Sequence, residues 1–265
     1  MTATSFAALH HADAPLLLPN AWDHASAALL AAQGFAAIGT TSLGVAAAAG
    51  LPDGAAVTRD LTVRLARQLG GAPYLLSVDA EDGYGQDPAE VAELARELAA
   101  AGAVGINVED GLGPADLHAA KIAAVKAAVP DLFVNARTDT HWLGDAADER
   151  ETVRRLDAYQ QAGADGVFVP GLTDPARITA LLKTLDVPLN ILYSPAGPSV
   201  AALADLGVRR ISLGSYLYRR ALGAALDAMA DIRSGRSSRG TAPTYDEVQA
   251  LGTRASTGKD RRRTS

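Results

Sequence analysis

The strongest constraint on the fold is an alternation of short apolar runs with longer helical segments along the whole chain. Eight runs have the length and composition of buried strands: Leu16–Ala21, Ala36–Thr41, Tyr74–Ala80, Val104–Val108, Phe133–Ala136, Gly166–Val169, Leu189–Leu192 and Arg210–Leu213. Amphipathic segments lie between them, such as Pro88–Ala101, Pro114–Ala128, Asp145–Ala162 and Asp174–Leu185. Strands that alternate with helices form a parallel sheet, and eight such units favour a closed (β/α)8 (TIM) barrel.

An open, doubly wound sheet is the structural alternative. Such a sheet commonly has a glycine-rich fingerprint after its first strand, whereas this chain has Pro19-Asn20-Ala21-Trp22-Asp23 at that point. Four glycines precede predicted strands and are interpreted as helix caps: Gly34, Gly102, Gly163 and Gly207. The absence of the fingerprint favours the barrel.

Length and composition fit one enzyme-sized body. The 265 residues suit a single barrel, and the lack of cysteine excludes disulfides, thiolate metal sites and thiol nucleophiles. Met1–Leu18 has no basic segment followed by an apolar one, and no apolar run of about 20 residues occurs, so we expect neither a signal peptide nor a membrane span. We therefore expect a cytoplasmic protein with a barrel and its C-terminal helix in residues 1–232. Residues 233–265 are expected to form an extension, partly helical and mobile at its end.

Charge is distributed unevenly along the chain. The net charge is −6, but the residues from Arg233 onward contain eight Lys and Arg against three acidic residues, which leaves −11 on residues 1–232. An acidic body argues against nucleic acid as a partner. The run Arg261-Arg262-Arg263 is interpreted as a solvated terminus.

Polar residues cluster where the predicted strands end. Side chains alternate along a strand, so residues that share the barrel interior are spaced i, i+2. Four strand ends have this spacing: Asn20/Trp22, Ser77/Asp79/Glu81, Asn107/Glu109 and Asn135/Arg137. Because the active sites of barrel enzymes lie at the carboxyl ends of the strands, we predict a site there.

Three acidic residues point to a metal. Asp79 and Glu81 end the third strand and Glu109 ends the fourth, and adjacent strands lie about 4.8 Å apart. Unpaired carboxylates at this distance repel one another, and a hard divalent ion such as Mg2+ or Mn2+ removes the conflict. The alternative is that some of these acids cap helices or pair with arginine. Asp82 and Asp110 are expected to point away from the barrel axis.

The remaining candidates concern substrate. Arg137 is suited to bind a carboxylate, unless it pairs internally with an acid. The turn from Gly39 to Gly44, with Ser42 and Leu43, offers backbone N–H groups for an anion. Further candidates for lining the site or exchanging protons are Trp22, Tyr84, His141, Asn190 and Ser215, although Ser215 is more simply a helix N-cap. His118 and Lys121 are also candidates for an acid or base, but we predict that they lie on a solvated helix face.

From Leu18 to about Ile232 the chain resembles the isocitrate lyase / phosphoenolpyruvate mutase superfamily. The resemblance rests on these segments: Pro19–Asp23, Thr41–Gly44 with Gly50–Asp53, Asp79–Gly85, Asn107–Asp110 and Asn135–Asp139. It implies Mg2+ bound at Asp79, with Glu81, Glu109 and Asp53 holding its waters. It also implies that the Ser42–Gly44 backbone and Arg137 bind a 2-oxo carboxylate. A homotetramer that exchanges C-terminal helices is implied as well.

One part of the family pattern is missing. The lyases that split isocitrate or methylisocitrate have a Lys-Lys-Cys-Gly-His loop after the fourth strand, whereas here Gly111-Leu112-Gly113-Pro114 leads directly into a helix. The mutases and hydrolases of the family have a longer gating loop there. The part of the site that binds substrate therefore matches, and the part that breaks the bond does not.

These observations lead to three functional hypotheses. The first is a Mg2+-dependent carbon–carbon lyase, with decarboxylation as one form, that acts on a 2-oxo acid of the pyruvate, oxaloacetate or 2-oxoglutarate class. The second is P–C bond chemistry, and the third is a non-catalytic 2-oxo acid binder. For the first we assign catalytic roles to Arg137, Asp53 and His141. Substrate binding is assigned to Trp22, Ser42, Leu43, Gly44, Asp79, Arg137 and Asn190, and metal binding to Asp79, Glu81 and Glu109.

Overall fold

The fold is a parallel barrel that is closed through its first strand. The computed structural model describes residues 5–144 and 148–253. Its strands are β1 (Leu16–Leu18), β2 (Asn20–Ala21), β3 (Ala37–Thr40), β4 (Leu75–Asp79), β5 (Ala103–Glu109), β6 (Phe133–Arg137), β7 (Gly166–Val169), β8 (Leu189–Leu192) and β9 (Arg210–Ser212). All pairings are parallel, in the order β1-β9-β8-β7-β6-β5-β4-β3-β2.

The predicted first strand is divided at Pro19, and this division closes the ring. β1 pairs with β9, and β2 pairs with β3. The Leu18 carbonyl accepts a hydrogen bond from the Leu213 N–H at 3.2 Å, while the Pro19 carbonyl accepts one from the Gly39 N–H at 2.8 Å. The two short strands thus occupy one position in an eight-position ring, and the predicted (β/α)8 barrel is confirmed.

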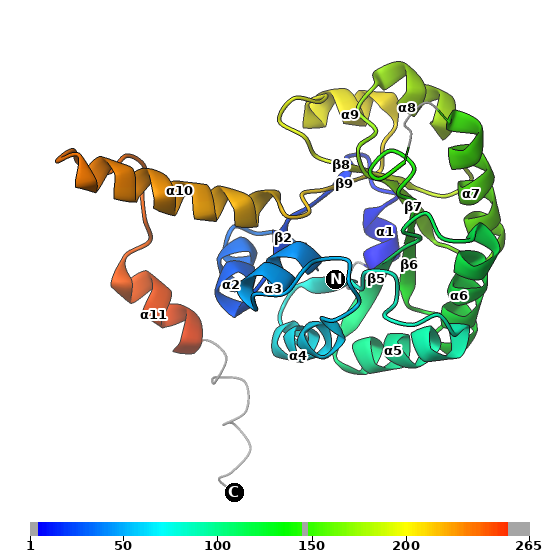
Figure 1. The fold of residues 1–265 in the computed structure, drawn as a ribbon, viewed down its shortest axis with the longest axis horizontal. Helices are drawn as coiled ribbons and strands as arrows, with labels where there is room; N and C mark the ends of the chain where they lie inside the picture. Colours follow the sequence, from blue (N-terminus) through cyan, green and yellow to red (C-terminus); the bar gives the residue numbers. More distant parts are fainter. Residues whose placement is uncertain (1–4, 145–147, 254–265) are drawn as a thin grey trace, which may run out of the picture.

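Most of the helices surround the sheet, whereas the first lies within the ring and the last two extend away from it (Figure 1). The helices are α1 (Phe6–Leu9), α2 (His24–Ala32), α3 (Ser42–Ala48), α4 (Arg59–Leu69), α5 (Pro88–Ala100), α6 (Ala115–Ala128), α7 (Glu149–Gln161), α8 (Pro175–Leu182), α9 (Val200–Leu206), α10 (Tyr216–Arg233) and α11 (Tyr245–Thr253). The four glycines predicted as caps all follow helices and have φ between +86° and +100°, a conformation that side chains with a Cβ disfavour. The predicted boundaries of α5 and α6 are correct to within one residue.

A small aromatic cluster fills the amino-terminal end of the barrel. Phe6 of α1 meets the Phe133 ring edge-on at 5.4 Å, and His10 stacks on the same ring at 4.2 Å. A side chain at Gly105 would meet the Phe6 ring at 2.7 Å, so β5 must have glycine here. The side chains of Phe6, His10 and Phe133 therefore occupy the barrel interior at this end.

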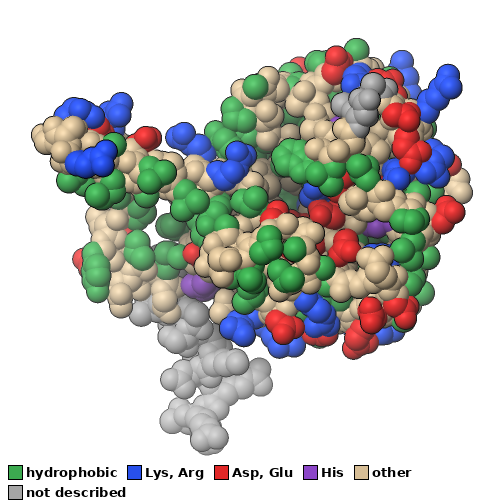
Figure 2. Space-filling view, in the orientation of Figure 1, with side chains coloured by type: hydrophobic (Ala, Val, Ile, Leu, Met, Phe, Trp, Pro, Cys, Tyr) green, Lys and Arg blue, Asp and Glu red, His purple; other side chains and the backbone are tan. Residues whose placement is uncertain are grey.

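The C-terminal helices leave the barrel. α10 extends away from it, and α11 turns back toward α2, where a His24 ring nitrogen lies 3.3 Å from the Leu251 carbonyl (Figure 1). Leu226 and Met229 of α10 are 72% and 61% exposed, and Figure 2 shows hydrophobic side chains along this arm. Helix α10 therefore has an apolar face without a partner in the described part of the chain.

Some expectations lie outside the described residues. They include the start of the predicted helix at Asp145 and the basic run Arg261–Arg263. Within the described ranges, no helix has the length and apolar character needed to cross a membrane.

His10 should make the stability depend on pH. Burial, and next the charge of Arg210, lower the pKa of His10 from 6.5 to about 3. Between these values the unfolded chain binds a proton that the folded chain does not, so this part of the stability is present above pH 6.5 and is lost as the pH falls. We predict that His10→Gln makes the free energy of unfolding fall less steeply below pH 6.5, by up to about 1.4 kcal/mol per pH unit. Urea denaturation of both proteins at several pH values measures this, and equal slopes would contradict the prediction.

Candidate active site

Two adjoining cavities open at the carboxyl ends of the strands. The central cavity is lined by Ser42, Leu43, Asp79, Asn107 and Ser212, among others. The side cavity is lined by Glu81, Glu109, His118 and Lys121, among others. Asp53, Arg137 and Trp142 line both cavities. The structure therefore gathers most of the predicted site residues at the predicted end of the barrel, but divides them between two spaces.

The end of β3 is tied to the end of β4. The Ser42 N–H donates to an Asp79 carboxylate oxygen at 3.1 Å, and the Asp79 N–H donates to the Thr40 hydroxyl at 2.9 Å. The Ser42 side chain also forms a hydrogen bond with Asp53. Ser42, Asp53 and Asp79 are thus held as one unit at the rim of the central cavity.

Trp22 and Gly44 pack against each other beside the turn that contains Ser42. A Cβ on Gly44 would lie 2.9 Å from the Trp22 Cβ and 2.8 Å from the Thr41 methyl carbon. Trp22 itself meets Tyr218 of α10 edge-on, at 5.3 Å between ring centres. Neither Trp22 nor Gly44 belongs to the lining of the two cavities, so both contact the binding loop and not the space in front of it.

The three predicted metal ligands do not converge. Glu81 accepts hydrogen bonds from the Thr58 hydroxyl and the Ala56 N–H, and its φ of +46° places it in a strained turn. Glu109 forms an ion pair with Arg137 at 2.6 Å. In residues 5–144 and 148–253, no group of three His, Asp or Glu side chains is placed to hold one ion directly. The three carboxylates therefore have separate partners in this structure, and metal binding at Asp79, Glu81 and Glu109 stays a prediction.

The acids nevertheless influence one another. Burial raises the pKa of Glu109 to about 8; Arg137 opposes this shift and Asp79 adds to it. Burial also raises the pKa of Asp53, against the hydrogen bond from Ser42 and with a contribution from Asp79. Excess negative charge of this kind suits Mg2+, which often keeps several waters and uses only one or two protein carboxylates. The arrangement implied by the resemblance, with Asp79 as ligand and the other acids holding waters, remains a prediction that these residues fit.

Arg137 is held in place by one acid at the end of β5 and another in the loop after β6. Besides Glu109, it contacts Asp139, whose carboxylate oxygen lies 2.7 Å from both Nε and Nη2. Burial disfavours the charged guanidinium, but Glu109 and Asp139 outweigh it and raise the pKa of Arg137. The internal ion pair considered as an alternative is thus present. Arg137 still lines both cavities, so its fixed guanidinium remains available to an anion.

His118 and Lys121 are not on a solvated face, and that prediction was wrong. They are 3% and 4% exposed, and Lys121 Nζ donates to the Asp82 carbonyl at 2.9 Å, which ties α6 to the acidic turn after β4. Burial lowers the pKa of His118 to about 4, although Asp110 acts to raise it. The sequence contained a usable signal, because these two residues share the i, i+3, i+4, i+7 spacing of the buried Ile122 and Val125.

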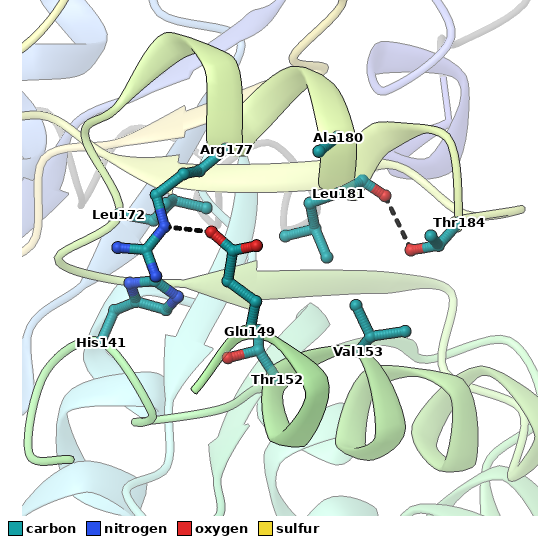
Figure 3. Close-up of a pocket in the computed structure, with 9 residues that line it drawn as sticks. All are labelled: His141, Glu149, Thr152, Val153, Leu172, Arg177, Ala180, Leu181 and Thr184. Atoms are coloured by element: carbon teal, nitrogen blue, oxygen red, sulfur yellow. Dashed lines mark hydrogen bonds and ion pairs between the residues drawn. The ribbon is translucent and has the colours of Figure 1, made fainter. Parts of the chain in front are cut away.

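His141 and Asn190 are not brought to the cavities. His141 lines a separate pocket between α7 and α8, beside the ion pair of Arg177 and Glu149 at 2.5 Å (Figure 3). Asn190 is buried in the barrel, where its amide donates to the Ser212 hydroxyl at 3.0 Å. Trp142, the neighbour of His141, lines both cavities, as Asp53 and Arg137 do, and it was not among the residues predicted from the sequence.

Asp110 points away from the barrel axis, as expected. It accepts hydrogen bonds from Arg155 at 3.0 Å and from the Tyr159 hydroxyl at 2.7 Å, behind the sheet. Sequence reasoning missed both partners. Both Asp110 and its neighbour Glu109 belong to the lining of the side cavity, but Glu109 pairs with Arg137, whereas Asp110 pairs with Arg155 and Tyr159.

Comparison with known proteins identifies the family. The model of the family described as phosphoenolpyruvate phosphomutase matches residues 6–233. The chain belongs to this family. An uncharacterised protein of Mycobacterium tuberculosis is 44% identical over 251 residues, 93% of this chain and 95% of that protein. An oxaloacetate decarboxylase of Pseudomonas aeruginosa is 33% identical over 204 residues, 71% of this chain and 69% of that enzyme. The solved complex of a phosphonopyruvate hydrolase with oxalate and Mg2+ is 25% identical, with a TM-score of 0.82 and 96% coverage of each chain.

The contact between Gly44 and Trp22 can be tested by substitution. We predict that Gly44→Ala costs about 1–3 kcal/mol of stability, because the new methyl group must displace Thr41 or Trp22. It should also weaken carboxylate binding, since the Ser42–Gly44 backbone moves. Gly223→Ala in α10 is the matched control, because a methyl group there has no atom within 4 Å. Thermal unfolding and oxalate titration compare the two variants, and equal behaviour would contradict the predicted contact.

Proposed function

We propose that the protein is a Mg2+-dependent carbon–carbon lyase acting on a small 2-oxo acid, with decarboxylation of an oxaloacetate-type substrate as its reaction. The observation that supports this best is the placement of Arg137, Asp79 and the Ser42–Leu43 turn around one cavity. The 33% identity to an oxaloacetate decarboxylase supports the same substrate class. When bound, Mg2+ would supply a Lewis acid that stabilises the negative charge of an enolate.

The side chains would contribute binding and orientation. Arg137, held between Glu109 and Asp139, presents a fixed cation to a substrate carboxylate. Asp79 would hold the metal, with Glu81, Glu109 and Asp53 as acceptors for its waters. Thr58 and Ala56 fix the orientation of Glu81 before any ligand arrives, so the site is preorganised for this role.

Decarboxylation suits the chemistry that this chain retains. The bond between the leaving carboxylate and C3 breaks, its electron pair forms the enolate, carbon dioxide leaves, and a proton is added at C3. No separate base is needed, which agrees with the missing Cys-containing loop. A retro-aldol cleavage would need a base, and His118, a buried imidazole with a lowered pKa, lines the side cavity together with Glu81 and Glu109.

The proposal predicts metal-dependent turnover of oxaloacetate. With Mg2+ the parent protein should release pyruvate and carbon dioxide faster than Mg2+ alone, and EDTA should remove this activity. Oxalate with Mg2+ should stabilise the fold, by about 2.7 kcal/mol at 100 times its Kd. Asp79→Asn should abolish the effect of the metal, whereas Arg137→Lys should weaken oxalate binding more than Mg2+ binding.

The outcomes separate the three hypotheses. Turnover of phosphonopyruvate but not of oxaloacetate would favour P–C chemistry, as in the related hydrolase. Oxalate binding without turnover of either compound would indicate a binding protein. If Asp79→Asn binds Mg2+ and oxalate as the parent does, the proposed site is wrong.

We also propose that the protein forms a homo-oligomer, a tetramer by family likeness, through its C-terminal helices. Support comes from α10, whose Leu222, Leu226 and Met229 are 50%, 72% and 61% exposed at i, i+4, i+7 spacing. An apolar stripe of this kind on a soluble surface is typical of a protein–protein contact. A second copy of the chain is the partner that the resemblance implies.

Charge placed on this stripe should dissociate the oligomer. We predict that Leu226→Glu lowers the molar mass in light scattering after size exclusion to a smaller species, because a carboxylate cannot be buried unpaired. Ala224→Glu, on the opposite side of the same helix, should leave the mass unchanged. A parent that is monomeric, or a Leu226→Glu variant with the parent's mass, would contradict the proposal.

A further inference from the structure

The barrel interior below the central cavity contains an arginine without a carboxylate partner. Arg210 on β9 is 1% exposed, and within residues 5–144 and 148–253 no acidic side chain lies at ion-pair distance from it. Barrel interiors are normally filled by branched aliphatic side chains. Burying a charged group costs folding free energy unless hydrogen bonds compensate for the lost hydration, so the stability of Arg210 in this position depends on its partners.

Both partners of Arg210 line the central cavity. Nη2 donates to Asn107 Oδ1 at 3.0 Å, and Nε donates to Ser212 Oγ at 3.0 Å. Each acceptor receives a second hydrogen bond from inside the barrel: the Asn135 amide donates to Asn107 Oδ1 at 2.8 Å, and the Asn190 amide donates to Ser212 Oγ at 3.0 Å. Arg210 itself does not line the cavity; it contacts the two residues that do, Asn107 and Ser212, which together are called the floor of the cavity.

These contacts fix which atoms remain for the cavity. A guanidinium has donors only, so the Asn107 atom that it contacts must be the oxygen, and the usual ambiguity between amide O and N does not arise. The Asn107 NH2 group has no hydrogen-bond partner in the described part of the chain. Ser212 Oγ already accepts twice, so its own proton is free to donate. Both floor groups therefore present donors.

We propose that Arg210 is a positioning residue that turns the Asn107 amide and the Ser212 hydroxyl into donors toward the central cavity, where they bind an oxygen of an anionic substrate. The inference rests on the proposed function for the class of substrate. It adds a second contact for the anion, besides Arg137, that is built from neutral donors. The floor then favours a carboxylate or enolate oxygen and disfavours a ligand that has only donors.

Two substitutions of Arg210 distinguish the effect of its hydrogen bonds to Asn107 and Ser212 from the effect of its positive charge. Arg210→Met removes both hydrogen bonds and the charge, while Arg210→Lys keeps the charge but cannot reproduce two donors fixed in one plane. We expect both variants to raise the Kd for oxalate, titrated calorimetrically with Mg2+ present, by about tenfold, the scale of one lost hydrogen bond to a charged group. Their melting temperatures identify any loss of folding.

A second pair of variants does not disturb the buried charge. Ser212→Ala removes one floor donor, and Ser77→Ala is the matched control, because Ser77 is equally buried on β4 but does not line the cavity. We expect Ser212→Ala to raise the oxalate Kd several-fold, roughly as one hydrogen bond should, and Ser77→Ala to leave it unchanged. This pair decides the matter if the Arg210 variants do not fold.

Each outcome has a defined meaning. If Arg210→Lys binds oxalate as the parent does while Arg210→Met does not, charge alone matters and the positioning role is wrong. If Ser212→Ala and Ser77→Ala bind equally well, the donor floor is wrong. A parent that binds no oxalate contradicts the proposed function and this inference together, whereas a parent that binds with all variants unchanged contradicts only this inference.

Discussion

The rest of the structure depends on the closure of the ring at Asn20. Its amide donates to the Thr40 carbonyl at 2.7 Å, and its carbonyl oxygen accepts from the N–H groups of Leu213 and Gly214 at 3.0 and 2.9 Å. One side chain therefore joins the end of β3 to the loop after β9, across the place where Pro19 divides the first strand. The segments after β3 and β9 both line the central cavity. The hydrogen bonds that close the barrel therefore also position the residues of the site.

The charges of the acidic side chains are balanced both by residues that line the cavities and by a residue in the barrel interior. Asp53, Asp79, Glu81 and Glu109 line the two cavities, and so do the basic side chains of Arg137, Lys121 and Arg219. Arg210 adds a positive charge from the barrel interior, and burial lowers its pKa to about 9 while Asp79 acts to raise it. This arrangement of charges is the basis for the proposal that a small divalent ion and a small anion bind together. The chain has the family's strand-end motifs and lacks the Cys-containing loop.

The sequence predicted the structure correctly where a local pattern is compatible with only one kind of structure. The strands were predictable because short apolar runs between helices have few other structures, and Arg137 and Asp79 were predictable because strand ends meet at one edge of a barrel. The predictions failed where they depended on the orientation of a side chain. Strand spacing placed Glu81 with Asp79, but the left-handed turn at Glu81 directs its carboxylate to Thr58. His118 and Lys121 looked solvated because polar side chains on a helix usually are.

The sequence by itself determined the order of the strands, the family and the residues at the strand ends, because these follow from periodicity and from motifs that are local in the chain. Only the tertiary structure decided how those residues are oriented. The partners of Arg137, the hydrogen bonds of Arg210 and the distance of His141 from the cavities depend on side chains that are far apart in sequence. Such contacts exist only after the ring has closed, since closure brings the first strand beside the last.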